Sequence, residues 1–119
     1  MADGFLTTHV LDTARGLPAS GMDIALFRLN GVNREHLVTM TTNDDGRTDS
    51  PILPAGAFVT GQYELVFYAG AYLDAVGVPS EDPRFLSDIP IRFGISDPDS
   101  HYHVPLLISP FGYSTYRGS

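Results

Sequence analysis

Residues 101–108 read HYHVPLLI, and their alternation decides the class of fold. Successive side chains of a β-strand point to opposite faces, so residues two positions apart share a face. The even positions of this stretch are apolar or aromatic and suit a core: Tyr102, Val104, Leu106 and Ile108. His101 and His103 lie on the other face. The stretch therefore predicts a strand that buries one face and turns two imidazoles outward.

Residues 5–11 repeat this arrangement near the N-terminus. Their core-facing positions are Leu6, Thr8 and Val10. His9 projects from the opposite face, because it alternates with that set. Three of the four histidines are thus expected on outer sheet faces, in two strands that lie far apart in the sequence. His36 begins another predicted strand beside charged neighbours, and is expected to be an ordinary surface residue.

Apolar runs and turn residues divide the remaining sequence into short elements. Further strands are predicted at residues 22–29, 36–42, 62–68, 89–95 and 113–116. The strongest turn signal is Asp45-Gly46, since this pair tolerates a left-handed backbone. One helix is predicted at residues 69–76, where Gly77 ends it. Seven or eight strands with one short α-helix indicate an all-β protein, an antiparallel β-sandwich, as a single domain over residues 1–119.

The composition excludes several classes of function. Of the 119 residues, 43% are hydrophobic and 18% charged, and the net charge is -7. All 7 basic residues are arginine, and cysteine is absent. A thiolate nucleophile, a disulfide, a cysteine-held metal and a lysine Schiff base are therefore excluded. An acidic chain without a basic run is also a poor binder of nucleic acid.

Several familiar sequence signals are missing. No stretch approaches the roughly 20 apolar residues of a membrane helix, so no membrane partner is expected. The first residues do not form a basic region followed by an apolar core, so no signal peptide is expected and the cytoplasm is the predicted location. Neither a Gly-x-Ser-x-Gly elbow nor a glycine-rich phosphate loop is present. A serine hydrolase and a nucleotide site are therefore not predicted.

The outward histidines and the arginines allow more than one interpretation. In one interpretation, the three imidazoles are simply solvated on the exterior of the sandwich. In another, His101 and His103 form a His-x-His pair that binds a metal. No metal site is predicted, because no acidic residue shares the faces of these histidines and a zinc site usually needs three or four protein ligands. Arg47 directly follows Asp-Asp-Gly and could be an exposed surface charge of little energetic value. Arg117 belongs to a terminal Tyr-Arg-Gly-Ser segment that could be frayed, or could be ordered and end in a site.

Four motifs together resemble the transthyretin-related proteins over nearly the whole chain. They are LTTHVLDTARGLPA at residues 6–19, TNDDGRT at 42–48, HYHVPLL at 101–107 and YSTYRGS at 113–119. The terminal YRGS resembles the C-terminal tetrapeptide of the branch of this family that hydrolyses 5-hydroxyisourate. This tetrapeptide distinguishes that branch from the hormone-carrying transthyretins. The differences are small and leave the motif residues intact: FLSDIP at 85–90, Ile108 and Phe111.

The resemblance implies a transthyretin-like fold of two four-stranded sheets, assembled as a homotetramer with sites at the dimer–dimer interface. It implies hydrolysis of 5-hydroxyisourate to 2-oxo-4-hydroxy-4-carboxy-5-ureidoimidazoline in urate degradation, with no metal and no organic cofactor. The catalytic residues it implies are His9, Arg47, His103 and Ser119. The residues expected to bind substrate are His9, Arg47, His101, Tyr116, Arg117 and Gly118.

Elementary electrostatics adds an expected mechanism to these roles. Burial and the neighbouring positive charges should lower the pKa values of the three clustered histidines below about 6.5. A neutral His9 or His103 could then activate water, and Arg47 could stabilise the oxyanion. The site is expected to be a small cationic channel in an acidic protein. Two rival classes are a non-catalytic carrier of a small aromatic ligand and a structural sandwich of the kind appended to larger enzymes.

Overall fold

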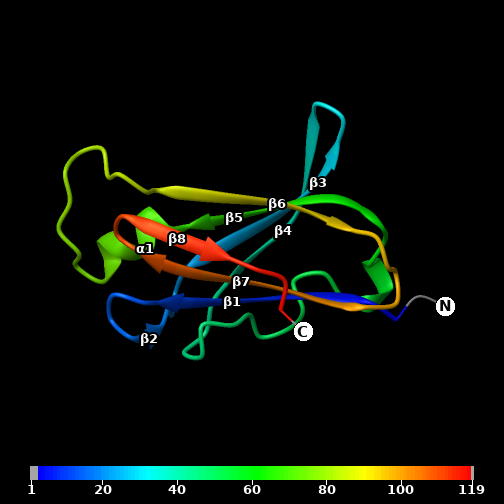
Figure 1. The fold of residues 1–119 in the computed structure, drawn as a ribbon, viewed down its shortest axis with the longest axis horizontal. Helices are drawn as coiled ribbons and strands as arrows, with labels where there is room; N and C mark the ends of the chain where they lie inside the picture. The colour runs from blue at the N-terminus through cyan, green and yellow to red at the C-terminus, as the bar shows by residue number, and fades with distance from the viewer. Residues whose placement is uncertain (1–2, 119) are drawn as a thin grey trace.

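A computed structural model describes residues 3–118, which form two four-stranded sheets with a shared core between them (Figure 1). One sheet has the strand order β2-β1-β7-β8 and the other has the order β4-β3-β5-β6. The strands are β1 (Phe5–Asp12), β2 (Leu17–Pro18), β3 (Asp23–Asn30), β4 (Asn33–Thr41), β5 (Gly61–Tyr68), β6 (Asp88–Ile95), β7 (His101–Ser109) and β8 (Gly112–Thr115). One α-helix, α1 (Ala69–Ala75), and a 3-10 turn at Ala55–Ala57 complete the described elements. The predicted all-β sandwich with one short helix is confirmed.

The alternating positions of β1 and β7 face the core as the sequence predicts. Leu6 and Val10 of β1 and Leu106 of β7 are fully buried, and Tyr102 is 4% exposed. The opposite sheet contributes Leu26, Leu65 and Ile91 to the same core, among other buried residues. Burial of each such side chain contributes about 1.5–3 kcal/mol, so this shared core holds the two sheets together.

The pairing of β1 with β7 differs from a purely antiparallel arrangement. These two strands run parallel, with Thr7 opposite His103, whereas the other strand pairs are antiparallel. Both strands start at the same end of the molecule, where the amide of Gly4 donates to the carbonyl of Pro98. The two arrows accordingly point the same way in Figure 1. This pairing makes the two histidine-bearing strands immediate neighbours.

Two further details differ from the expected pattern. The two-residue strand β2 forms within the segment predicted as a turn, by pairing with the end of β1. Glu64 of β5 alternates with the buried Tyr63 and Leu65, yet it is itself only 2% exposed. Its carboxylate binds Arg34 at 2.6 Å and Arg92 at 2.8 Å, so two strands supply the cations that cover it. Of the described helices, none has the length and apolar character needed to cross a membrane.

Candidate active site

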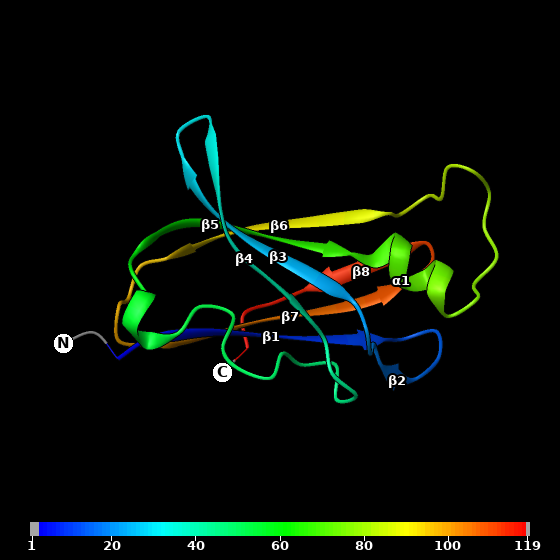
Figure 2. The same ribbon diagram turned by 180° about the vertical axis from the view of Figure 1, so that it is seen from behind.

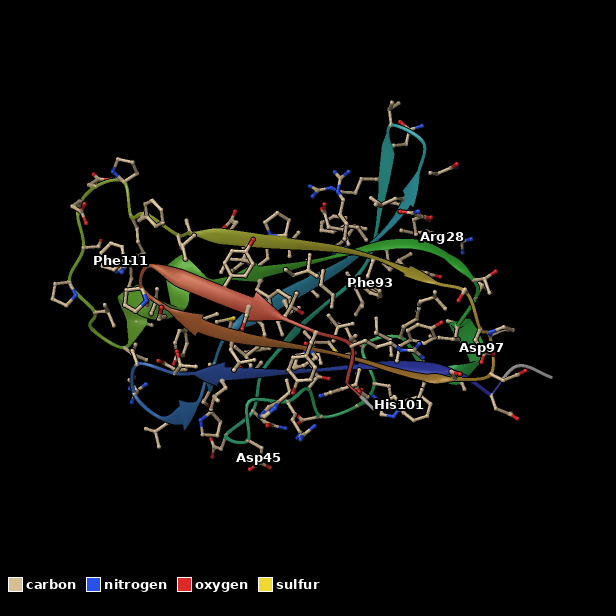
Figure 3. All side chains as sticks on the ribbon, viewed as in Figure 1. Arg28, Asp45, Phe93, Asp97, His101 and Phe111 are labelled. Atoms are coloured by element: carbon tan, nitrogen blue, oxygen red, sulfur yellow. The ribbon has the colours of Figure 1, made fainter. Side chains whose placement is uncertain are left out.

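A pocket of about 480 Å³ lies on the outer face of the β2-β1-β7-β8 sheet. Strands β1 and β7 form its floor, and residues 47–51 of the β4–β5 connection and the segment after β8 form its sides. Its lining residues are Thr7, Thr8, Arg47, Thr48, Asp49, Ser50, Pro51, His101, His103, Tyr116 and Gly118. In Figure 3, His101 marks the position of β7 at this site, and Asp45 marks the turn that precedes the loop. The pocket therefore gathers residues from all four motifs found in the sequence.

Main-chain hydrogen bonds attach both sides of the pocket to β1 and β7. On one side, the β4–β5 connection runs along β1, where Gly46 accepts a hydrogen bond from Val10 and Leu53 accepts one from Leu6 (Figure 2). This connection places Arg47 in an antiparallel bridge with His9. On the other side, the amide of Gly118 donates to the carbonyl of His103 at 2.7 Å. Arg47 and the C-terminal segment are thus fixed to the sheet by main-chain contacts.

The turn before Arg47 is built by one side chain and one glycine. Oδ1 of Asn43 accepts from the amides of Asp45 and Arg47, and its Nδ2 donates to Asp49 at 3.0 Å. Gly46 has φ +74°, and a Cβ there would collide with the carbonyl oxygen of Val10. Only glycine combines that backbone with so close an approach. The Asn-Asp-Asp-Gly sequence therefore fixes the position of Arg47 against β1.

Three imidazoles lie close together on the outer face of the sheet. The ring centroids of His9 and His103 are 6.5 Å apart, and those of His101 and His103 are 6.1 Å apart. His101 also stacks on Phe5 at 4.2 Å with an interplanar angle of 12°. The hydroxyl of Thr7 lies between two of the rings, 2.6 Å from Nε2 of His101 and 2.7 Å from Nδ1 of His103. The expected cluster of His9, His101 and His103 is therefore present within one chain.

The environment of two of these histidines favours the neutral ring. Burial lowers the pKa of His103, and the charges of Arg47, His101 and His9 lower it further. Burial and Arg47 also lower the pKa of His9, while a hydrogen bond to the Asp45 backbone and the Asp45 carboxylate oppose the shift. Both directions agree with the expectation, and both have the expected causes. At neutral pH each of these rings can accept a proton.

The C-terminal residues are divided between the two sides of the sheet. Tyr116 and Gly118 line the pocket, as expected, and Tyr116 also borders a second cavity. The guanidinium of Arg117 instead lies over the ring of Tyr102 at 4.1 Å, beside a separate cavity. Since Tyr102 alternates with the two outward histidines, this contact is on the other side of β7 from the pocket. Ser119, the remaining predicted residue, lies outside the described part of the chain.

Several residues of the pocket were not predicted from the sequence. Thr7 shares the outward face of its strand with His9, and Thr48 follows Arg47 in the TNDDGRT motif, but neither was predicted to belong to the site. Ser50 and Pro51 carry no signal. Asp49 brings a carboxylate into a pocket that was expected to be a cationic channel. Within residues 3–118, no three histidine, aspartate or glutamate side chains are grouped so that they could hold a metal ion.

Comparison with known proteins places this arrangement in a family. The chain matches the model of the HIUase/Transthyretin family over residues 6–118. It is 60% identical to "5-hydroxyisourate hydrolase 2" of Rhizobium meliloti over 116 residues, which cover 98% of this chain and 97% of that protein.

Solved structures agree with this match. The 5-hydroxyisourate hydrolase of Klebsiella pneumoniae has a TM-score of 0.80 and 37% identity, with 97% of this chain and 99% of that chain covered. An (S)-allantoin synthase has a TM-score of 0.92 and 49% identity, covering 99% of this chain, which spans only 44% of that longer protein. The chain therefore belongs to the HIUase/Transthyretin family.

Proposed function

We propose that the protein is an enzyme that hydrolyses 5-hydroxyisourate to 2-oxo-4-hydroxy-4-carboxy-5-ureidoimidazoline, a step of urate degradation in purine catabolism. The observation that carries this proposal is the juxtaposition of Arg47 with two histidines whose pKa values are lowered, His9 and His103, on one sheet face. A carrier of an aromatic ligand has no need for a proton acceptor beside a guanidinium. The high identity to relatives named 5-hydroxyisourate hydrolase supports the same substrate.

The proposed reaction adds water to a ring carbonyl and opens the adjacent C–N bond. The oxygen of water bonds to the carbonyl carbon, the C–N bond breaks, and the departing nitrogen takes up a proton. His103 or His9 accepts the proton of the attacking water, which typically contributes about 10² to 10⁴ in rate. Arg47 donates hydrogen bonds to the oxyanion that forms on the carbonyl. The guanidinium is suited to this role because it stays protonated and offers several donors.

The other predicted residues are assigned to holding the substrate. Tyr116, Gly118 and His101 line the pocket and can orient a flat, oxygen-rich ring. The catalytic role of Ser119 stays a prediction. A contact of Arg117 with substrate also stays a prediction, and would require its guanidinium to leave the ring of Tyr102.

We further propose that a second copy of the chain covers the pocket, in a homotetramer with sites at the dimer–dimer interface. The pocket is open to solvent on an outer sheet face, and Tyr116 at its side is 61% exposed. Exclusion of bulk water strengthens the electrostatic contacts that the proposed reaction uses. Light scattering would give the oligomeric state, and activity per chain should fall on dilution below the concentration at which tetramers dissociate. The expected cytoplasmic location stays a prediction, which cell fractionation would test.

The central test generates 5-hydroxyisourate with urate oxidase and follows its ultraviolet decay with and without the protein. Acceleration over spontaneous decay supports the hydrolase, and binding of an aromatic ligand without acceleration supports the carrier. His9→Ala, Arg47→Ala and His103→Ala should each lower kcat/KM at least about tenfold, a loss of about 1.4 kcal/mol in transition-state stabilisation. His36→Ala is the matched control, since His36 is exposed on the other sheet. Full activity in all three site variants would refute the assignment.

A further inference from the structure

One hydroxyl group connects the two histidines of β7. Oγ1 of Thr7 is 2.6 Å from Nε2 of His101 and 2.7 Å from Nδ1 of His103, both within the range of strong hydrogen bonds. The parallel register explains this contact, because Thr7 lies directly opposite His103 and its side chain shares the outer face with both imidazoles. Thr7 is half-buried, and Phe5 holds the ring of His101 by stacking. The three groups therefore form a chain with fixed geometry.

A hydroxyl carries one hydrogen and two lone pairs, and this limits how the chain can be arranged. Thr7 can donate to only one of the two ring nitrogens, so at least one of the two rings must donate an N–H to Thr7. His103 donates from Nδ1 while Thr7 donates to His101, or both bonds run in the opposite direction, or both rings donate to Thr7. The tautomers of the two neutral histidines are consequently coupled through Thr7.

The hydrogen bond at Nδ1 determines which nitrogen of His103 is left for the proposed reaction. If Nδ1 of His103 accepts from Thr7, the proton of the neutral ring sits on Nε2, and the ring has no free lone pair. If Nδ1 instead donates to Thr7, Nε2 presents a lone pair. Only the second arrangement leaves His103 able to accept a proton from water.

We propose that Thr7 is a positioning residue that holds the proton of His103 on Nδ1, so that Nε2 of His103 is the proton acceptor of the site. In this arrangement Thr7 accepts from Nδ1 of His103 and donates to Nε2 of His101. His101 acts through Thr7 by keeping the hydroxyl turned away from His103. This assignment rests on the proposed hydrolase function, and the tautomer is measured independently of activity.

The direct test is the tautomer of His103, read from the 15N resonances of its ring at about pH 8, above the ordinary imidazole pKa of about 6.5. Protonated and unprotonated ring nitrogens resonate far apart, so the assignment is unambiguous. In the wild-type protein, Nδ1 of His103 should be protonated and Nε2 unprotonated. Thr7→Val should shift His103 toward a mixture of tautomers, and Thr7→Ser should restore the wild-type pattern. A proton on Nε2 in the wild type, or an unchanged His103 spectrum in Thr7→Val, would overturn the proposal.

A second measurement separates positioning from a purely structural role. Thr7→Val should lower kcat for 5-hydroxyisourate about tenfold, a fraction of the full contribution of a general base, while KM changes less than about twofold. Thr7→Ser should recover most of the loss. The matched control is Thr39→Val, because Thr39 bonds Nε2 of His36 at 2.7 Å on the other sheet, and its removal should change neither His103 nor kcat.

The two arms distinguish this inference from the proposed function. Full kcat in Thr7→Val, or an equal loss in Thr39→Val, would refute the positioning role. If the wild-type protein fails to hydrolyse 5-hydroxyisourate, the proposed function falls, and the 15N spectra still decide whether Thr7 sets the tautomer of His103.

Discussion

The substitution Gly118→Ala tests how closely the C-terminal segment is fitted to the proposed site. A Cβ at Gly118 would lie 2.6 Å from Cδ2 of His103 and 3.2 Å from its Cβ and Cγ. Ordinary van der Waals contact begins at about 3.4 Å, so either the imidazole or the segment must move by close to 1 Å. The hydrogen bond from the amide of Gly118 to the carbonyl of His103 opposes a simple retreat of the segment. The strain therefore falls on the ring that we assign as a proton acceptor.

A displacement of this size has a large expected effect on rate and a small one on stability. A misplacement of about 1 Å at a reacting group can cost about 10²-fold, so kcat/KM should fall by about 10- to 100-fold. This corresponds to about 1.4–2.7 kcal/mol of transition-state stabilisation. Gly118 has no positive φ and lies near the chain end, so alanine should not lower the melting temperature.

The assay compares the decay of enzymatically generated 5-hydroxyisourate for the wild type, Gly118→Ala and a matched control. Gly112→Ala is the control, because it lies on the neighbouring strand β8 and its new Cβ would meet only Oγ of Ser109, at an ordinary 3.6 Å. This control should retain activity within about twofold, judged against the tenfold loss expected at Gly118. Wild-type kcat/KM in Gly118→Ala would show that contact between this segment and His103 does not matter for turnover.

Three more expected outcomes follow from the same geometry. Arg47→Gln should lower kcat/KM and shift its acid limb to higher pH, because removing the charge raises the pKa values of His9 and His103. A pH–rate profile measures both effects. Asn43→Ala removes the side chain that binds the amide of Arg47 and should lower kcat/KM about tenfold, a transition-state loss of about 1.4 kcal/mol, with little change in KM in steady-state kinetics. Burial raises the pKa of Glu64, but its two arginine partners outweigh burial and lower it. Glu64→Gln should therefore lower the unfolding free energy at pH 7 by about 1–3 kcal/mol. It should also flatten the decline of the unfolding free energy below about pH 4, which denaturant titrations across pH would show.

The sequence predicts the strands and their faces because burial imposes a local pattern of period two. That pattern correctly separates Tyr102 from His101 and His103, and it needs no knowledge of neighbouring strands. It fails at Glu64, where a charged side chain is buried only because arginines from two other strands reach it. Such pairing depends on residues remote in sequence, which leave no local signal.

The site was predictable in its residue types but less so in its construction. Histidines facing outward on two strands could be read from alternation, whereas the parallel neighbourhood of β1 and β7 could not. Without that register nothing distinguishes Thr7 from any other strand threonine. Arg117 illustrates the opposite problem, since a motif joins it to Tyr116 and Gly118 although its guanidinium packs against Tyr102. Neighbours in a strand segment alternate sides, so membership of one motif does not place residues in one pocket.

The charge of the pocket differs from the cationic channel expected of an otherwise acidic chain. His103 in the pocket and His9 beside it favour their neutral forms, and Asp49 adds a carboxylate, so Arg47 supplies the positive charge among these groups. One guanidinium can then serve two needs of the proposed reaction. In that reaction it would stabilise a developing oxyanion, and the same field disfavours imidazolium, which would keep the neighbouring base unprotonated. A lysine would supply the charge without the planar set of donors, and an additional charged histidine would itself be unable to accept a proton. The pairing of arginine with neutral histidine thus explains how a chain without lysine or cysteine could activate water at neutral pH.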